Sequence, residues 1–310
     1  MLKYILKRVL LILPILLGVI VIVFSIINAV PGDPGRRILG GSAAQEDVDA
    51  LNHELGVDQR FVPGLFYYIK KIVTRFDFGL SYQSMKPVLP TLQSNFKYTL
   101  RLAVLMTIGY VIIGVPLGVL SAVKQYSLID NVTRVTSVSL SAFPSFWLYM
   151  MAILFFSLQL GWLPSGGVDS WKHYILPVVC ASVLNSSSLQ RMTRTTMLET
   201  IRQDYIRTAR AKGCAKVDVV WKHAFLNAAL PIINSVGISF GAMLGGTVIC
   251  ESVFNMPGLG TVIIKAINSK DIPMVMGCTV LLSSIFCVIV LLVDIISAMV
   301  DPRVKAKLTN

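Results

Sequence analysis

Long uncharged apolar runs recur along nearly the whole of this 310-residue chain, and they limit it to one class of fold. An α-helix needs about 20 apolar residues to cross the roughly 30 Å of hydrocarbon in a bilayer. Only 14% of the residues are charged, whereas soluble domains carry about 25%. We therefore predict an all-α integral membrane protein with one domain over residues 1–310. About six transmembrane helices are expected, at residues 9–30, 102–123, 135–160, 174–193, 229–252 and 274–300.

The run over 174–193 is the least apolar of the six, because four consecutive polar residues, 185–188, lie in its middle. Polar groups at membrane depth usually face other helices or a water-filled cavity. This helix is therefore predicted to have a protein or water-lined neighbour. Hydrogen bonds between helices would explain the same residues equally well as a polar path. The candidate path residues are Asn185, Ser186, Ser187, Ser188, Asn234, Ser235 and Ser239.

Lysine and arginine collect before the first run, between the second and third, in the loop 194–228, and after the last. These places share one side of the membrane if the chain crosses six times, and short cytoplasmic loops are rich in Lys and Arg. Both termini are therefore predicted to be cytoplasmic, and the long loop 31–101 to be extracytoplasmic. The net charge of +12 then reflects topology and contact with anionic lipid rather than nucleic-acid binding. The first run is too long for a signal peptide, so we expect it to be a retained span.

The loop 31–101 contains two segments with helical patterns. In residues 43–58 the apolar positions Val48, Leu51 and Leu55 recur at three- to four-residue spacing, which predicts an amphipathic helix. Residues 61–76 combine aromatic and basic side chains, which is typical of a helix at a membrane interface.

Two acidic residues, Glu251 and Asp294, lie in or near the apolar runs. Because ionisable groups there are costly, each is expected to face a partner or a cavity. We predict an interior structural role for both, with a place on a transport path as an alternative. For Asp294, a helix-end charge near the cytoplasmic interface is a further alternative.

The remaining residue types argue against a catalytic or metal site. The histidines are scattered without ligand spacing, and no cysteine pair has the CxxC spacing, so no metal site is predicted. No paired carboxylates, GxSxG or HExxH pattern supports an enzyme. The GxxxxGK[ST] phosphate loop is also absent from the sequence, so the chain itself is expected to bind no ATP and no cofactor.

The most informative segment is the basic loop 194–228. Ala209 and Ala211 favour a helix, and Gly213 follows a basic turn, which is how a short helix ends. Apolar residues at helical spacing, Val217, Val220 and Trp221, then predict a second helix. Such a helix–turn–helix element suits docking to a partner; a solvated basic loop that only fixes topology is the alternative.

The run DYIRTARAKG (204–213), followed by Leu230–Pro231, resembles the signature cytoplasmic loop of inner-membrane subunits of binding-protein-dependent ABC importers. That family's pattern has Glu-Ala-Ala, three residues, Gly, and later Leu-Pro. Here Arg207-Thr208-Ala209 replaces the first three, and Leu-Pro lies farther on; both departures resemble the dipeptide/oligopeptide branch, which also includes nickel and glutathione importers. Further matching motifs are the start MLKYILKRVLLILP, PGDP (31–34), LGVD (55–58), DFGLS (77–81), WLP (162–164), ESVFNMPGLG (251–260) and DPR (301–303).

The resemblance implies a type I ABC importer fold in the bacterial plasma membrane. The chain would form half of a translocation path for di- or oligopeptides, paired with a second homologous permease subunit in a hetero-pair. Two ATP-binding subunits would hold ATP and Mg²⁺, and an extracytoplasmic substrate-binding protein would deliver the cargo. The coupling contact to the ATPase subunit would be made by Asp204, Tyr205, Ile206, Arg207, Thr208, Ala209, Arg210, Ala211, Lys212 and Gly213, with Arg207, Arg210 and Lys212 as its charged members.

Two alternatives remain open. The same architecture could import nickel, glutathione or another small solute, because the family does not fix the cargo. A stand-alone channel or ion-driven transporter would be expected to show several buried charges or an internal repeat. The sequence offers few such charges and no visible repeat.

Overall fold

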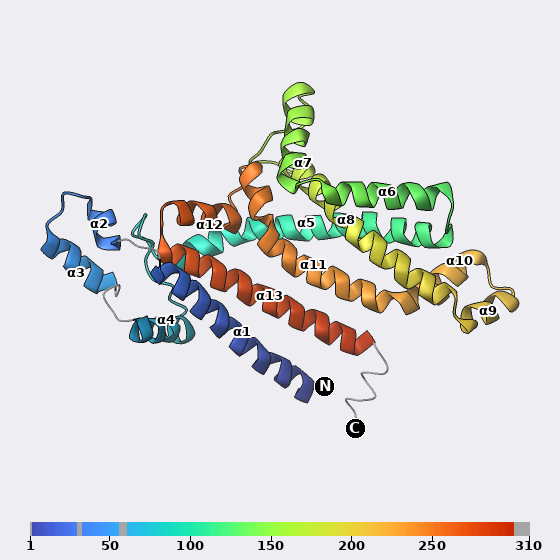
Figure 1. Ribbon diagram of the computed structural model, residues 1–310, viewed down its shortest axis with the longest axis horizontal. Helices are drawn as coiled ribbons and strands as arrows, with labels where there is room; N and C mark the ends of the chain where they lie inside the picture. The colour runs from blue at the N-terminus through green and yellow to red at the C-terminus, as the bar shows by residue number, and fades with distance from the viewer. Residues whose placement is uncertain (1, 30–32, 56–60, 301–310) are drawn as a thin grey trace.

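The computed structural model describes residues 2–29, 33–55 and 61–300 of the chain, and within them the secondary structure is almost entirely helical (Figure 1). An isolated bridge between Leu80 and Pro87 is the one β-type pairing in these residues. The predicted all-α membrane fold is confirmed. Met1 of the start motif, residues 31–32 of PGDP, residues 56–58 of LGVD and the whole of DPR (301–303) lie outside the described residues.

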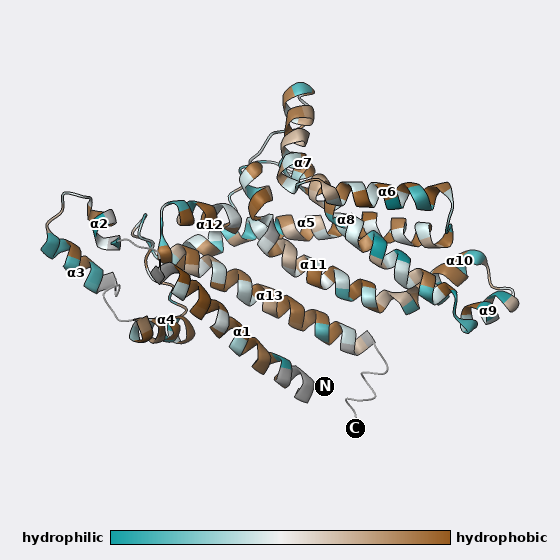
Figure 2. Ribbon diagram, in the orientation of Figure 1, coloured by the Kyte–Doolittle hydropathy of each residue, from teal (hydrophilic) through white to brown (hydrophobic). Residues whose placement is uncertain are grey.

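Four helical segments are long and apolar enough to cross a membrane, judged by length and composition. Three of them belong to α1 (Leu2–Ala29), α5 (Val88–Val123) and α13 (Ile272–Val300), and the fourth, Lys216–Gly245, starts in the preceding short helices and continues into α11 (Leu226–Val253). Figure 2 shows how strongly hydrophobic α1 and α13 are along their length. Each of these helices contains most or all of a predicted span, and α5 begins well before the predicted residue 102.

The third predicted span, 135–160, is not one straight helix. The chain forms α6 (Leu128–Ala142) and then α7 (Ser145–Ala152) with a π-helical extension η1 (Ile153–Gln159), and the two parts bend by 99°. The break lies at Phe143, which is extended at φ −81° and ψ 133°. Proline disfavours helical backbone in the residue before it, so Pro144 stops α6 and starts α7 in a new direction.

The fourth predicted span lies in α8 (Lys172–Ile201), which is long enough to cross but too polar to meet the same composition test. Many of its polar side chains are buried in the protein, among them Ser182 and Gln190. Ser182 donates to the carbonyl of Met106 at 3.1 Å, and Ser137 of α6 donates to Gln190. The described residues therefore contain four apolar spanning segments, a bent fifth candidate and the polar α8. The sequence predicted about six spans.

Helices α5 and α8 pack very closely, and glycines on α5 make this possible. At Gly118 an added Cβ would lie 2.5 Å from the Cβ of Thr193 and 2.7 Å from the carbonyl oxygen of Gln190. Gly114 faces Leu189 in the same way. Small residues let helix backbones approach in membranes, where apolar burial alone provides little driving force between helices.

One end of the bundle carries α2 (Pro34–Leu39), α3 (Gln45–Leu55), α4 (Phe61–Arg75) and α12 (Leu259–Asn268) (Figure 1). The helices α3 and α4 coincide closely with the two helical segments predicted in the long loop.

Two buried carboxylates order the α12 end. Glu251 is fully buried and accepts hydrogen bonds from the Thr99 hydroxyl and the Gly260 amide, both at 2.7 Å. Asp271 accepts from the Ser81 hydroxyl and from the Tyr82 amide at 3.0 Å. Each carboxylate lies next to the start of a helix, where unpaired amides and the helix dipole favour a negative charge.

The opposite end carries the turn between α5 and α6, together with α9 (Asp204–Ala211), α10 (Lys216–Asp218) and the π-helical η2 (Val219–Phe225). In Figure 1, α1 begins and α13 ends toward this same end. The elements at this end are those for which the Lys and Arg pattern predicted a common side of the membrane.

Gly118→Ala tests the close contact of α5 and α8. The added methyl group has no room, so we expect a loss of about 1–3 kcal/mol in the free energy of unfolding. Gly245→Ala in α11 is the matched control, because a Cβ there meets no atom within 4 Å. It should be neutral or gain up to about 1 kcal/mol from helix propensity. Thermal unfolding of the detergent-purified chain measures both; equal stability of the two variants would contradict the packing account.

Candidate coupling site

The short helix α9 is defined by local sequence signals. Asp204 lies in its first turn and Arg210 in its last, as the helix dipole favours. Gly213 follows the helix with φ +78°, a left-handed conformation that suits glycine. In this turn the Gly213 amide donates to the Arg210 carbonyl at 3.0 Å, and the Cys214 amide to the Ala209 carbonyl at 3.2 Å. The glycine turn therefore closes α9 and redirects the chain toward α10.

The ten predicted coupling residues divide into a buried and an exposed set. Ile206 and Ala209 are buried and belong to the main apolar cluster, which also contains Met197 of α8 and Val219 and Ala224 of η2. These contacts fix α9 on the end of α8. The exposed set is Asp204, Tyr205, Arg207, Thr208, Arg210, Ala211, Lys212 and Gly213.

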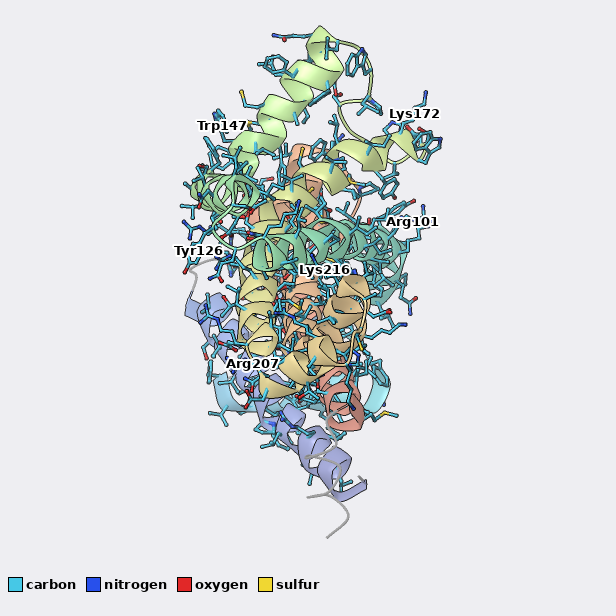
Figure 3. All side chains as sticks on the ribbon, turned by 90° about the vertical axis from the view of Figure 1, so that its right-hand side faces the viewer. Arg101, Tyr126, Trp147, Lys172, Arg207 and Lys216 are labelled. Carbon is cyan, nitrogen blue, oxygen red and sulfur yellow. The ribbon has the colours of Figure 1, made fainter. Side chains whose placement is uncertain are left out.

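The exposed surface of α9 is basic and has few internal partners. Arg207 approaches Asp204 at 3.6 Å, but both side chains remain largely exposed, so the pair contributes little to stability. Partial burial raises the pKa of the Tyr205 hydroxyl, which therefore stays protonated and able to donate at neutral pH. Figure 3 looks onto this end of the molecule, where Arg207 and Lys216 are labelled. Chemically, this surface can bind a groove that offers carboxylates and hydrogen-bond acceptors.

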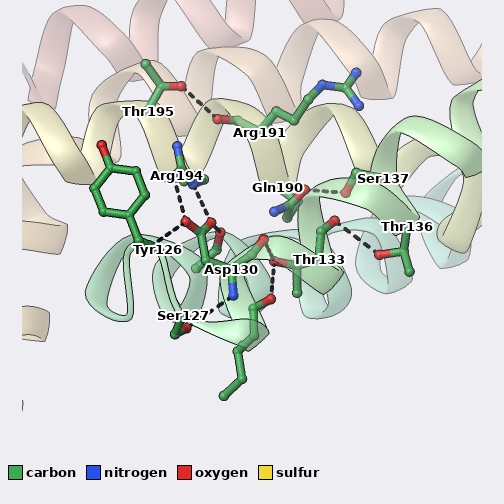
Figure 4. A network of polar contacts seen from close by, with 12 residues as sticks. Tyr126, Ser127, Asp130, Thr133, Thr136, Ser137, Gln190, Arg191, Arg194 and Thr195 are labelled. Atoms are coloured by element: carbon green, nitrogen blue, oxygen red, sulfur yellow. Dashed lines mark hydrogen bonds and ion pairs between the residues drawn. The ribbon is translucent and has the colours of Figure 1, made fainter.

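A buried ion pair joins the first turn of α6, directly after the α5–α6 turn, to α8, about three turns before α9 (Figure 4). Arg194 of α8 donates from Nε and Nη2 to the two carboxylate oxygens of Asp130 at 2.7 and 2.8 Å. Asp130 is fully buried and also accepts from the Ser121 hydroxyl at 2.6 Å and the Tyr126 amide at 2.9 Å. Two parallel bonds from one guanidinium fix its orientation as well as its position. The end of α8 that carries α9 is therefore fixed to the α5–α6 turn.

The candidate path residues do not form one site. Asn185 lines a pocket of about 220 Å³ together with Ser239, Tyr149 and Thr247. Ser188 is exposed, and its hydroxyl donates to the Asn185 carbonyl at 2.9 Å.

The other candidate polar residues have structural contacts. Asn234 of α11 accepts a hydrogen bond from Ser297 of α13, while the adjacent Ser235 is partly buried. Asp294 of α13 forms an ion pair with Arg8 of α1 at 2.8 Å. Glu251 is held by hydrogen bonds at the start of α12. Asn185 and Ser239 are therefore the predicted path residues that the structure places in the pocket.

Within the described residues, no group of three or more histidine, cysteine, aspartate or glutamate side chains could hold a metal ion. Cys214, beside the α9 turn, is exposed, and the other four cysteines are buried.

Sequence reasoning missed Asp130, Arg194 and Asp271. Arg194 was interpreted only as one of many topology-setting charges. Asp130 offered a weak signal, since an acidic residue stood in an otherwise basic and apolar turn. The pairing across 64 positions leaves no local pattern.

Removing the buried carboxylate should be costly. We expect Asp130→Ala to lose about 3 kcal/mol of folding free energy, because Arg194 would remain largely buried without its counter-charge. The control, Asp218→Ala, removes the more exposed pair with Lys222, which has a 2.8 Å contact, and should lose less than about 1 kcal/mol. Denaturant or thermal unfolding in detergent compares them. A loss no larger for Asp130→Ala than for the control would show that the buried pair is unimportant for stability.

Comparison with known families places this geometry in context. The family model described as "Binding-protein-dependent transport system inner membrane component" matches residues 114–306. A second model, "Binding-prot-dependent transport system membrane comp, N-term", matches residues 1–103.

Curated relatives match the chain from end to end. The glutathione transport system permease protein GsiC of Escherichia coli (strain K12) is 38% identical over 307 residues, covering 99% of this chain and all of the relative. GsiC of Shigella dysenteriae serotype 1 (strain Sd197) gives the same values.

Solved structures share the fold. A chain of the inward-facing MetNI methionine ABC transporter superposes with a TM-score of 0.58 at 22% identity, covering 68% of this chain and 96% of that one. An amino acid ABC transporter crystallised with histidines gives a TM-score of 0.51 at 18% identity, covering 69% and 94%. These structures confirm the predicted type I importer fold. The chain therefore belongs to the inner-membrane components of binding-protein-dependent transport systems, as a multi-pass, non-catalytic permease subunit of an ABC importer in the peptide, nickel and glutathione branch.

Proposed function

We propose that this chain forms half of a translocation path for small peptides and that α9 couples it to an ATP-hydrolysing partner subunit. The observation that carries the proposal is the division of α9 into a buried seat, Ile206 and Ala209, and an exposed basic surface. A helix that is packed on one side and exposed on the other can transmit movement from a docked partner to the helix against which it packs.

The contacts support a route for this movement. A displacement of α9 would be transmitted to α8 through the apolar contacts of Ile206 and Ala209. The ion pair of Asp130 with Arg194 would transmit it further to the start of α6. Because α5 and α8 are tightly packed, the three elements would move together rather than flex independently. ATP and Mg²⁺ are expected on two partner subunits, whose closed and open states would bias the path between two conformations.

The pocket around Asn185 is the proposed contact of this chain with the cargo. Its lining combines neutral polar groups with Met106 and Met243 and contains no formally charged side chain. Such a lining offers hydrogen bonds but no opposite charge, so a charged cargo would bind weakly. Weak binding suits a site through which the cargo passes. Selectivity is then expected to come mainly from the extracytoplasmic binding protein.

For the cargo, we favour short peptides, among which glutathione is a tripeptide. Support comes from the DYIRTARAKG loop and from relatives that are named as glutathione transport permeases. Nickel is the weaker candidate, because the described residues lack a cluster of metal-ligating side chains.

We also propose that the end of the molecule with α9 faces the cytoplasm and that a second, homologous permease subunit pairs with this chain. The basic loop at that end supports the orientation. The projecting α7–η1 arm supports pairing, because Trp147, Phe155 and Leu158 expose apolar side chains there.

Charge reversal on α9 tests the coupling role. We expect Arg207→Glu with Arg210→Glu to weaken copurification of the ATPase subunits and to reduce transport at least tenfold, since both side chains are on the exposed surface. The stability of the chain itself should be unchanged. Lys216→Glu, an exposed basic residue beyond the glycine turn, is the control and should retain most activity. Reconstituted importer, assayed for ATP hydrolysis and uptake, provides both readings; full coupling in the double variant would refute the docking role.

Cargo is tested with the importer reconstituted with its binding protein. We expect ATP-dependent uptake of a labelled tripeptide, reduced by excess unlabelled dipeptide or glutathione and unaffected by Ni²⁺. Uptake of ⁶³Ni²⁺ without peptide uptake would overturn the peptide assignment while leaving the permease role intact.

A further inference from the structure

Helix α4 has one face packed against the protein. Leu65, Tyr68 and Ile72 contact the apolar cluster that contains Phe24 near the end of α1. The ring centroids of Phe24 and Tyr68 are 6.3 Å apart, and Phe24 also meets Phe61 edge-on at 5.4 Å. The position of α4 relative to α1 is therefore fixed by aromatic contacts.

A second face of α4 is apolar but exposed. Val62, Phe66 and Val73 are 71%, 72% and 69% exposed. At roughly 100° per residue, their side chains lie within about 40° of one another around the helix axis. The exposed apolar stripe therefore runs along most of the helix, beside the packed face.

The rest of the circumference is polar and basic. Lys70, Thr74 and Arg75 are exposed, and Lys71 lies with its Nζ 5.0 Å from the Tyr67 ring centre and 3.9 Å from Asp77. A helix with an apolar stripe on one side and lysine or arginine on the other is suited to lying in the boundary between acyl chains and headgroups.

The depth of α4 agrees with this placement. The apolar segment of α1 runs from Arg8 to Ile26, and α4 packs on Phe24 close to its end. This is the level at which hydrocarbon gives way to headgroups. Figure 1 shows α4 beside that end of α1 and not aligned with it.

We propose that α4 is an in-plane anchor that inserts Val62, Phe66 and Val73 into the leaflet at the α2–α4 end and binds anionic phospholipid headgroups with Lys70, Lys71 and Arg75. The occupant is lipid, because the stripe lies at the depth of the membrane boundary and is bordered by positive charge. Phospholipid phosphates complement that charge. The anchor would fix the base of the segment that carries α2 and α3.

Collision accessibility of nitroxide labels tests the anchor. The importer would be assembled with its partner subunits in nanodiscs of phosphatidylethanolamine and phosphatidylglycerol, in a Cys214→Ser background that removes the exposed cysteine. Labels at Phe66→Cys and Val73→Cys should be relaxed more strongly by oxygen than by a water-soluble nickel chelate. The matched control, Thr74→Cys on the polar side of the same helix, should show the reverse. Stronger relaxation by the chelate at residue 66 would place the stripe in water. Protection from both reagents would show that a protein covers it; either result overturns the proposal.

The headgroup contact has a separate test. Replacing phosphatidylglycerol by phosphatidylcholine should lower the ratio of oxygen to chelate accessibility at residue 66. The triple variant Lys70→Gln, Lys71→Gln and Arg75→Gln should lose this lipid dependence. An equal ratio in both lipids for the unsubstituted helix would overturn the anionic-lipid part of the proposal.

Discussion

The contact between α5 and α8 is the interaction on which the remaining architecture depends. Helix α8 is too polar to face lipid along its length, so its buried Ser182 and Gln190 need protein partners. Glycines such as Gly118 bring α5 near enough to supply them, and α6 contributes Ser137. The Asp130–Arg194 pair completes the association at the α9 end. With this group of helices in place, α9 has a rigid support and the pocket around Asn185 has two of its walls.

A comparable device orders the other end. Glu251 and Asp271 are acidic residues in regions where charge is costly, and each accepts a hydrogen bond from an amide at a helix start, that of Gly260 in α12 and that of Met274 in α13. Glu251 lies in the motif ESVFNMPGLG and accepts a hydrogen bond from Thr99 of α5. Ser81 of the motif DFGLS donates to Asp271. Carboxylates therefore stabilise both ends of the bundle, by pairing with arginine at one end and by capping helices at the other.

Much of the fold could be predicted from sequence because the bilayer imposes a simple length rule. For α1, α5, α11 and α13, several observed helix ends lie within a few residues of the predicted span ends. The bend at Pro144 was harder, since the runs on either side of it are together apolar enough to suggest one span. Pro144 lies between the two runs, but the presence of a proline does not by itself distinguish a mild kink from a 99° turn. The candidate coupling site was likewise predictable only in part. A local motif identified α9, whereas Asp130 and Arg194 are joined only by tertiary structure, and the inward direction of Ile206 and Ala209 depends on helix phase against α8.

The composition of α8 also bears on how the protein enters the membrane. A segment that partitions poorly into lipid cannot be inserted as an independent unit at low cost, because its hydroxyl and amide groups would meet hydrocarbon before they meet protein. For α8, the favourable environment is the glycine-containing face of α5, which is synthesised earlier. The order of synthesis suits this requirement, because α5, which provides protein contacts for the polar side chains of α8, is made before α8. A change on the glycine surface of α5 would therefore act during biogenesis, before any effect on transport.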